Sequence, residues 1–346
     1  MAQNVSVKVL AADELLSKIE QAGLVGRGGA AFPVHLKWQR IKNLNDPKKY
    51  VVCNASEGEI GVKKDFYILE HFFKEVLEGI LLTMDFLETK EAYININKNY
   101  YQKLKAQIDA LIEPCNKRGY LIHIFEEQPS YIGGETGALL NAIEGKKTQP
   151  RLSPPSPSIT GIFHCPVLLH NVETFYDIAR VANDRYLPTR FSTILGTQNA
   201  GVYQVEIEQK VAEILRETNN YPTFAFFVQV GGGASGEVIT ASQAEDMKLS
   251  GAGSIEIYPS TTTAQQFLGK ILNFYAEESC GKCTPCRDGS WQLQQIIEKL
   301  AQDQVIPWSR LSPIVATMEQ SSFCGLGKSI AVPIKSYAKN ILGLEV

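Results

Sequence analysis

The chain has 346 residues, of which 44% are hydrophobic and 21% charged, and its formal net charge at pH 7 is −3. This length and composition predict two or three domains with packed cores, and the small net charge argues against nucleic acid or anionic lipid as a mainly electrostatic partner. The longest apolar runs are too short for direct membrane insertion, and the first residues, MAQNVSVKVL, lack the pattern of a signal peptide.

The first half of the chain alternates between two kinds of hydrophobic pattern. A helix is predicted over 11–22, where apolar residues recur at helical spacing before Gly23, and the glycine-rich turn GLVGRGGAAFP follows at once. Short apolar runs and longer amphipathic runs then predict, in order, strand 50–54, helix 65–88, strand 92–97, helix 100–115 and strand 120–125. This alternation predicts a parallel sheet with helices packed on its faces.

The second half changes character twice. The proline-rich segment 148–161 cannot form a helix or a central strand and should be a stiff surface crossing before a helix-like segment over 171–183. From near 197, a strand (GVYQVEIE), a short helix (QKVAEILRET) and a strand running into glycines (FAFFVQVGGGASG) predict a small α+β unit. From about 260 onward the pattern is helical to the end.

Three cysteines of the helical part form a run with two residues between neighbours. Cys280, Cys283 and Cys286 lie on a predicted loop between helices, and Cys324, in the glycine-flanked turn SSFCGLGKS, is the best candidate for a fourth ligand. Iron–sulfur clusters are often held by such a run together with one distant cysteine, which predicts a [4Fe–4S] site. Tetrahedral zinc is the alternative, although structural zinc more often uses two separated C-x-x-C pairs.

The other cysteines do not belong to this pattern. Cys53, Cys115 and Cys165 are expected to be packed or exposed thiols, because free cysteine is commonly buried as a small apolar residue. Seven cysteines, an odd number, clustered in this way resemble a ligand set more than a disulfide framework, so a reducing, cytoplasmic compartment is expected.

The glycine-rich turn has the composition of an anion-binding loop. Its glycines allow backbone N–H groups to approach a phosphate, Arg27 adds a positive charge and Phe32 a flat apolar face. The turn follows a helix, however, so its spacing is not that of the G-x-G-x-x-G motif after a strand. On its own it leaves a binding loop and a plain surface turn equally open.

Together, these features resemble a known family. The stretches that carry the resemblance span residues 23 to 329 in the family's order: GLVGRGGAAFPVHLKW, YVVCNASEGEIGVKKDFYILE, YIGGETGALLNAIEGKKTQPRL, HNVET, ESCGKCTPCRDG and SSFCGLGKS. They resemble the NADH-binding flavoprotein subunit of respiratory complex I, a family shared with NAD-linked hydrogenases and formate dehydrogenases.

The resemblance implies an α/β fold of three domains. A Rossmann-like domain over 1–196 would bind FMN and NAD(H), a β-grasp (SLBB) domain would occupy 197–258, and a helical bundle over 259–346 would carry one [4Fe–4S] cluster. It implies cofactor-binding roles for Gly26, Arg27, Gly28, Gly29, Phe32, Lys37, Asn54, Glu57, Glu59, Tyr131, Gly134, Glu135 and Asn171. It implies the metal ligands Cys280, Cys283, Cys286 and Cys324.

Several of these residues also have plain structural interpretations, and four positions depart from the family pattern. Asn171 can simply N-cap the following helix, Glu57 and Glu59 can be solvated loop charges, and Lys37 can be a surface lysine. The departures gather around the nucleotide pocket and are Ala31, Ser56, Thr136 and His170. They leave open the choice between NADH and NADPH and the retention of the flavin.

The implied function is that of an electron-transfer enzyme without a catalytic side chain. The chain would oxidise NADH, or reduce NAD⁺, through FMN and pass single electrons through the cluster to a partner subunit. Expected partners are a small thioredoxin-like [2Fe–2S] subunit and a hydrogenase or dehydrogenase subunit, in a cytoplasmic complex that can be peripheral to a membrane. The alternative is a non-catalytic relay subunit that keeps the cluster but has lost flavin or NAD(H) binding.

Overall fold

The computed structural model describes residues 5, 8, 10–301 and 304–345. It divides into two compact units, Met1–Gly58 with Lys63–Pro188 and Glu59–Val62 with Thr189–Val346. The segment MAQNVSVKVL, for which no signal peptide is expected, lies largely outside the described residues. Within the described part of the chain, no helix combines the length and the apolar character needed to cross a bilayer.

The first unit is built on a four-stranded parallel sheet. Its strands lie in the order β3-β2-β1-β4. Their bounds are β1 (Tyr50–Ala55), β2 (Glu91–Asn97), β3 (Leu121–Glu127) and β4 (Val167–Asn171). The central strand β1 is buried along almost its whole length, as expected for a parallel sheet with helices on both faces. The predicted parallel sheet is therefore confirmed.

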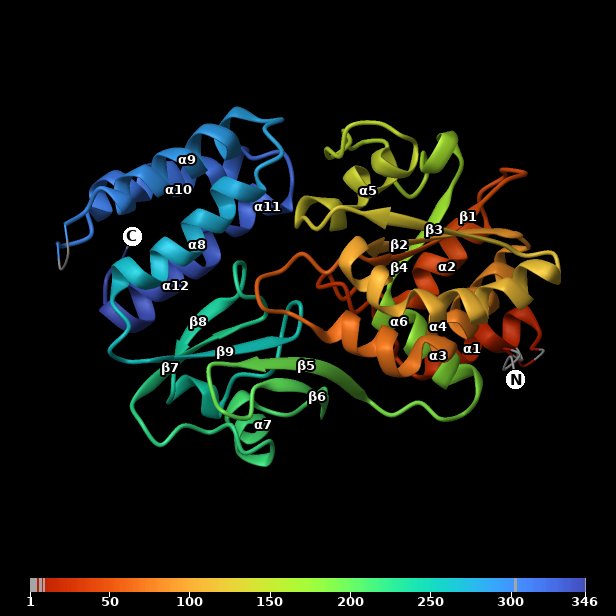
Figure 1. The fold of residues 1–346 in the computed structure, drawn as a ribbon, viewed down its shortest axis with the longest axis horizontal. Helices are drawn as coiled ribbons and strands as arrows, with labels where there is room; N and C mark the ends of the chain where they lie inside the picture. Colours follow the sequence, from red (N-terminus) through yellow and green to blue (C-terminus); the bar gives the residue numbers. More distant parts are fainter. Residues whose placement is uncertain (1–4, 6–7, 9, 302–303, 346) are drawn as a thin grey trace. The chain divides into compact units, whose positions relative to one another are not determined.

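Six helices cover this sheet. They are α1 (Ala12–Gln21), α2 (Val34–Lys42), α3 (Lys64–Leu87), α4 (Lys98–Lys117), α5 (Thr136–Ile143) and α6 (Val172–Ala182). Right-handed crossovers place α3 and α4 on one face and α5 on the other, because the chain returns past β1 to reach β4 (Figure 1). Helices α3 and α6 approach so closely that a Cβ on Gly79 would lie 2.0 Å from the carbonyl oxygen of Phe175. The proline-rich segment 148–161 forms neither helix nor strand, as predicted.

The second unit begins with a five-stranded mixed sheet in the order β6-β5-β9-β7-β8. Its strands are β5 (Thr189–Leu195), β6 (Gly201–Glu206), β7 (Phe226–Val230), β8 (Glu237–Thr240) and β9 (Ser254–Pro259). Helix α7 (Val211–Glu217) packs Ile214 and Leu215 against one face. A single helix on such a sheet is the predicted β-grasp arrangement. The sheet includes β5, which precedes residue 197, and the limits of the three domains stay a prediction.

The rest of the second unit is helical, as predicted. Its helices are α8 (Ala264–Glu278), α9 (Thr284–Glu298), α10 (Trp308–Ser321), α11 (Gly325–Ser329) and α12 (Ala331–Leu342). Short 3-10 helices elsewhere in the chain are η1 (Ile132–Gly134), η2 (Ile162–His164) and η3 (Gln243–Glu245). Phe267 of α8 stacks on Tyr337 of α12 with ring centroids 4.5 Å apart, and both rings contact Phe227 of β7. This aromatic layer joins the helices to the sheet.

Candidate functional site

The predicted nucleotide site is centred on the carboxyl ends of β1 and β4. The strand order reverses there, since the chain leaves β1 towards β2 on one side, whereas β4 lies on the other. In open α/β sheets, ligands bind outside the carboxyl ends of the strands at such a point. Asn54 of β1 and Asn171, the last residue of β4, are register partners. Two predicted site residues therefore lie side by side.

The glycine-rich turn lies against Asn171. The N–H of Gly26 donates to the carbonyl of Phe32 at 2.9 Å, which closes the turn into a loop. Gly29 has a φ of 102°, a conformation that favours glycine. A Cβ on Gly28 would lie 3.6 Å from the Cβ of Asn171. The loop carries the Phe32 ring with half of its surface exposed, so a flat apolar face is available to a ligand.

The segment before α5 contacts the end of β1. The amide Nδ2 of Asn54 donates to the carbonyl of Gly134 at 2.9 Å. A Cβ on Gly58 would lie 2.4 Å from the Cα of Tyr131, so the loop after β1 packs directly on this segment. The carboxylate of Glu135 accepts from the N–H of Ala138 at 2.8 Å and caps α5. Backbone N–H groups, two amides and an exposed ring thus gather at one strand edge, a set that fits a phosphate-bearing ring ligand.

The side chain of Arg27 points into the protein. Its Nε lies 3.1 Å from Oδ2 of Asp177, its Nη2 donates to the Tyr186 hydroxyl at 3.1 Å, and both charged side chains are 5% exposed. Burial raises the pKa of Asp177 to about 7, although the Arg27 charge lowers it. The guanidinium therefore anchors the glycine-rich turn to α6. A phosphate contact by Arg27 stays a prediction.

Glu57 is not a solvated loop charge. Its carboxylate accepts from the N–H groups of Asp65 at 2.6 Å and Phe66 at 3.1 Å, in the first turn of α3, and from the Tyr100 hydroxyl at 3.0 Å. Burial and the nearby Asp65 carboxylate raise its pKa to about 8. Its backbone has a φ of 43°, which is uncommon for a residue with a side chain. The residue is held in one strained conformation beside the strand edge.

The carboxylate of Glu59 also accepts hydrogen bonds from the protein. Its Oε1 accepts from the N–H groups of Ala234 at 2.7 Å and Ser235 at 3.0 Å, within the second unit. A Cβ on Gly232 would lie 2.7 Å from the same oxygen, so glycine is needed there. The solvated-charge interpretation of Glu59 is wrong, and a nucleotide contact by Glu57 or Glu59 stays a prediction.

A buried ion cluster surrounds Asn171, and no sequence motif indicates it. Lys64 lies 2.7 Å from Asp65 and 3.0 Å from Glu173, and all three side chains are buried. The Asn171 amide donates to Asp65 at 2.6 Å, while its Oδ1 accepts from the N–H of Glu173 and so N-caps α6. The structural interpretation of Asn171 is correct. Cluster partners on α3 and α6 lie about a hundred residues apart, so local pattern does not connect them.

Lys37 of α2 and His170 of β4 are the next pair of residues near the end of β4. The ammonium of Lys37 donates to the carbonyl of Leu169 at 2.5 Å, and burial lowers its pKa to about 8. His170 is buried, accepts from the indole N–H of Trp38 at 3.0 Å, and has a pKa well below its usual range because of burial. It is therefore a neutral acceptor in the core, and Lys37 is more than an ordinary surface lysine.

Ser56, which departs from the family pattern, is buried in a polar network. Its hydroxyl contacts Glu127 at the end of β3 through a short hydrogen bond and accepts from the Asn95 amide at 2.7 Å. The amide of Asn95 also donates to Glu127 at 2.9 Å. Strand β3, which is separated from β1 by β2, thus brings a carboxylate to this edge of the sheet. Glu127 was not predicted, because the register that aligns β3 with β1 through β2 is a property of the fold.

The four predicted cluster ligands come from two connections between helices. Cys280 and Cys283 lie between α8 and α9, Cys286 lies in the first turn of α9, and Cys324 lies between α10 and α11. Burial raises the pKa of Cys286 to about 11, and the charges of the other three thiolates act in the same direction. The four sulfurs are therefore near enough to interact electrostatically.

Close contacts hold the two connections together. The N–H of Phe323 donates to the sulfur of Cys283 at 3.5 Å. A Cβ on Gly327 of α11 would lie 3.0 Å from the Cβ of Cys286, so this approach requires glycine. Cys283 occupies the N-cap position of α9, at the end where the helix dipole favours a thiolate.

Four cysteine thiolates can hold either an iron–sulfur cluster or a single zinc ion. Over residues 5, 8, 10–301 and 304–345, no three or more His, Cys, Asp or Glu side chains are grouped as ligands of one metal ion. Zinc would require all four sulfurs at about 2.3 Å from one point, whereas each thiolate of a cubane cluster binds its own iron. Of the remaining cysteines, Cys53 and Cys115 are buried and Cys165 is partly exposed, as expected.

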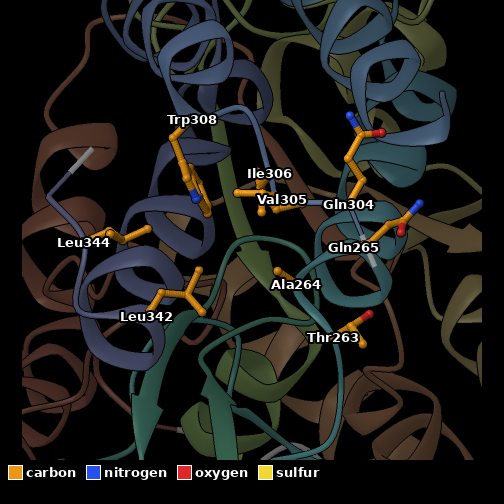
Figure 2. Close-up of a pocket in the computed structure, with 9 residues that line it drawn as sticks. All are labelled: Thr263, Ala264, Gln265, Gln304, Val305, Ile306, Trp308, Leu342 and Leu344. Carbon is orange, nitrogen blue, oxygen red and sulfur yellow. The ribbon is translucent and has the colours of Figure 1, made fainter. Parts of the chain in front are cut away.

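An apolar groove of about 610 Å³ lies elsewhere in the helical part (Figure 2). It is lined by Thr263, Ala264, Gln265, Gln304, Val305, Ile306, Trp308, Leu342 and Leu344. These side chains include neither a charge nor a thiol, so this groove lacks the donors that a phosphate or a cluster needs. The chemistry of the predicted sites lies in the strand edge and the cysteine loops.

Comparisons with known proteins match the two predicted sites to two separate regions of the chain. Residues 19–180 match the Nuo51 FMN-binding domain, and residues 266–341 match the NADH-ubiquinone oxidoreductase-F iron-sulfur binding region. The chain is 28% identical over 366 residues to one of the NADH-quinone oxidoreductase F subunits of Rhizobium meliloti, covering 95% of this chain and 87% of that protein. It is also 28% identical over 347 residues to its counterpart in Aquifex aeolicus, covering 91% and 81%.

A solved structure shares the fold. A chain of an NAD⁺-reducing [NiFe]-hydrogenase in the H2-reduced state superposes with a TM-score of 0.88 at 26% identity, covering 96% of this chain and 62% of that chain. The iron–sulfur match decides between the cluster and zinc in favour of the [4Fe–4S] cluster. Over most of its length this chain is therefore similar to NADH-quinone oxidoreductase F subunits, with one region that matches a Nuo51 FMN-binding domain and another that matches an iron–sulfur binding region.

Proposed function

We propose that this chain is an electron-transfer flavoprotein subunit that oxidises NADH, or reduces NAD⁺, and passes single electrons through its [4Fe–4S] cluster to a partner redox subunit. The observation that carries the proposal is the assembly of the glycine-rich turn, Asn54 and Asn171 at the strand-order reversal of the chain that also carries the four cysteines. FMN, when bound, supplies the exchange between two-electron hydride chemistry and single-electron transfer.

The residues of the strand edge bind and orient, and none of them acts as a nucleophile. The N–H groups of the glycine-rich turn would hold a phosphate, and the half-exposed Phe32 ring would stack on a flat ring. The Glu135 carboxylate, fixed as the cap of α5, would disfavour a 2′-phosphate and so favour NADH over NADPH. Hydrogen bonds within the protein hold these groups in place before any ligand arrives.

The partners belong to the same proposal. The named relatives are subunits of NADH-quinone oxidoreductases, and the matching structure is an NAD⁺-reducing hydrogenase, of whose chain this protein spans 62%. These names support a complex in which electrons pass on to other redox subunits. We propose a small thioredoxin-like [2Fe–2S] subunit and a hydrogenase or dehydrogenase subunit as partners, in a cytoplasmic complex that can lie peripheral to a membrane.

An anaerobic titration of the purified protein with NADH, and then with NADPH, tests the proposed function. We expect a flavin spectrum that NADH bleaches, with about four irons per chain, and a weaker response to NADPH. Iron without flavin and without bleaching would instead identify a relay subunit that has lost nucleotide chemistry. Bound zinc in place of iron would reject both functions.

The pH dependence of nucleotide binding tests Lys37. Burial lowers its pKa to about 8, so its charge is present at neutral pH and is lost as the pH rises through this value. If Lys37 holds a phosphate, the affinity for NAD⁺ should fall over the same range by about 1.5–3 kcal/mol, roughly 10- to 150-fold. Isothermal titration of the flavin-loaded protein with NAD⁺, which cannot reduce the flavin, measures this profile.

The control for this prediction lies on the same helix. Lys37→Gln should bind weakly at all pH values and flatten the profile, whereas Lys42→Gln, at the far end of α2, should keep it. A Lys37→Gln variant with the unchanged profile would show that Lys37 serves only to bind the Leu169 carbonyl.

A further inference from the structure

Ser279 lies at the end of α8, directly before the three-cysteine run. Its hydroxyl oxygen is 3.5 Å from the sulfur of Cys286, the third cysteine of the run, which lies in the first turn of α9. The contact joins the end of one helix to the start of the next. It places a polar side chain that is not itself a ligand against a predicted ligand sulfur.

The direction of this hydrogen bond follows from the chemistry of the ligand. Between a hydroxyl and a free thiol, either group can donate. A cysteine that holds a cluster does so as a thiolate, which has no proton to give. With the cluster bound, the Ser279 hydroxyl is therefore the donor and the Cys286 sulfur the acceptor.

The cysteine that Ser279 contacts is the most buried of the four predicted ligands. Cys286 is buried, whereas Cys280, Cys283 and Cys324 are partly exposed. Water can supply hydrogen bonds to the three exposed residues but has little access to Cys286, which is 5% exposed. A hydrogen bond in such a low-dielectric position is also electrostatically stronger than one in water. A donor from the protein therefore has its largest effect at Cys286.

The end of α8 is anchored by a contact that involves no cysteine. One turn before Ser279, the fully buried Tyr275 shares a hydrogen bond of 2.8 Å between its hydroxyl and that of Ser329 in α11. Ser279 itself ends the helix in an extended conformation, with φ −63° and ψ 118°. A packed helix thus carries the hydroxyl to its place beside Cys286, as a preorganised site requires.

Hydrogen bonds to the sulfurs are one of the factors by which a protein sets the reduction potential of an iron–sulfur cluster. Reduction adds one negative charge to the cluster and its thiolates. A hydrogen bond strengthens as the negative charge on its acceptor grows. A hydroxyl that donates to Cys286 therefore stabilises the reduced state more than the oxidised state, and the midpoint potential rises.

We propose that the Ser279 hydroxyl donates to the Cys286 thiolate and so raises the reduction potential of the cluster. Ser279 is a positioning residue in this role, because it contacts a ligand sulfur and acts on the cluster through it. The inference rests on the proposed function, since the cluster must be present. It adds a residue that binds neither iron nor nucleotide and yet sets how readily the cluster accepts an electron.

The test is a redox titration of the iron-loaded full chain, read by electron paramagnetic resonance of the reduced cluster. Ser279→Ala should lower the equilibrium constant for reduction about 3- to 10-fold, which for one electron is a shift of about 30–60 mV to more negative potential. Ser279→Thr keeps the hydroxyl and should retain the midpoint of the unchanged protein. Ser279→Val has the shape of threonine without the hydroxyl, so it should shift as Ser279→Ala does.

Ser290→Ala is the matched control. It removes a hydroxyl from the same residue type, but that hydroxyl donates to the backbone carbonyl of Cys286 at 2.7 Å and not to the sulfur. Its midpoint should equal that of the unchanged protein. A Ser279→Ala shift no larger than that of Ser290→Ala, or equal shifts in Ser279→Thr and Ser279→Val, would overturn the proposal.

Iron content separates an effect on the potential from an effect on assembly. All of these variants should bind about four irons per chain. If one of the two hydroxyl-free variants of Ser279 fails to bind iron, the other carries the comparison. Loss of iron in both would show that the contact serves assembly, and this too would overturn the proposal. Iron and a reduced-cluster signal with unmoved potentials reject only this inference, whereas their absence from the unchanged protein rejects the proposed function.

Discussion

Replacing Cys324 with serine or alanine should abolish assembly of the [4Fe–4S] cluster. The thiolate at this position comes from a different connection than the other three, so no neighbouring cysteine of the α8–α9 loop can take its place without moving the backbone. The iron content should fall from about four per chain to near zero, with loss of the broad visible absorbance. Iron analysis and the visible spectrum of protein purified without oxygen measure the effect.

Cys165→Ser is the matched control for this prediction. Cys165 is a partly exposed thiol of the first unit, in the connection between η2 and β4, and is not one of the predicted ligands. Its replacement should leave the iron content unchanged. Full iron in both Cys324 variants, with an unaltered spectrum, would remove Cys324 from the ligand set.

Asp177→Ala should destabilise the first unit by about 3–5 kcal/mol. Its carboxylate lies 3.1 Å from Arg27, and both side chains are 5% exposed. Removing one partner leaves a buried guanidinium without its counter-charge, which costs much more than the loss of an exposed pair. The shift of the urea midpoint, read from the unit's own transition, measures the change.

Two further variants show whether the stability change of Asp177→Ala comes from the buried ion pair. Glu113→Ala breaks the exposed pair with Lys117 on α4 and should cost only about 0.3–0.5 kcal/mol. The double variant Arg27→Met with Asp177→Leu replaces the buried pair by apolar side chains and should recover most of the stability. If the double variant also binds NADH normally, Arg27 is a structural residue and not a phosphate ligand. An Asp177→Ala cost no larger than that of Glu113→Ala would contradict the buried-pair account.

The sequence predicted those elements whose pattern is local. The alternation from strand 50–54 to strand 120–125 and the cysteine spacing each lie within a few turns of chain, and both agree with the structure. Strand β5 was missed because Arg190 and Ser192 are buried polar residues that interrupt an apolar run. Arg190 is accommodated by the carbonyls of Leu249 at 3.3 Å and Gly251 at 2.9 Å, which no local pattern reveals.

The site was predicted as a set of residues but not as an arrangement. Arg27 has the position of a phosphate ligand in a glycine-rich turn, yet its guanidinium meets Asp177, 150 positions further along the chain. The acidic residues that were expected to contact nucleotide also accept hydrogen bonds from backbone N–H groups of the protein, as Glu57 does at α3. Such hydrogen-bond and ion-pair partners depend on which helices and strands the fold brings together. The spacing of residues within a local sequence motif does not reveal them.

The four-residue segment Glu59–Val62 has a consequence for dividing the protein. It belongs with residues 189–346 although it lies between β1 and α3, and its Glu59 binds the N–H groups of Ala234 and Ser235. A fragment that starts at Thr189 would therefore lack Glu59, which accepts from the N–H groups of Ala234 and Ser235. A fragment that stops at Pro188 would contain Glu59–Val62 without the unit to which these residues belong. If the two units are expressed separately, Glu59–Val62 should be joined to the fragment that starts at Thr189. A simple cut after Pro188 leaves both fragments incomplete.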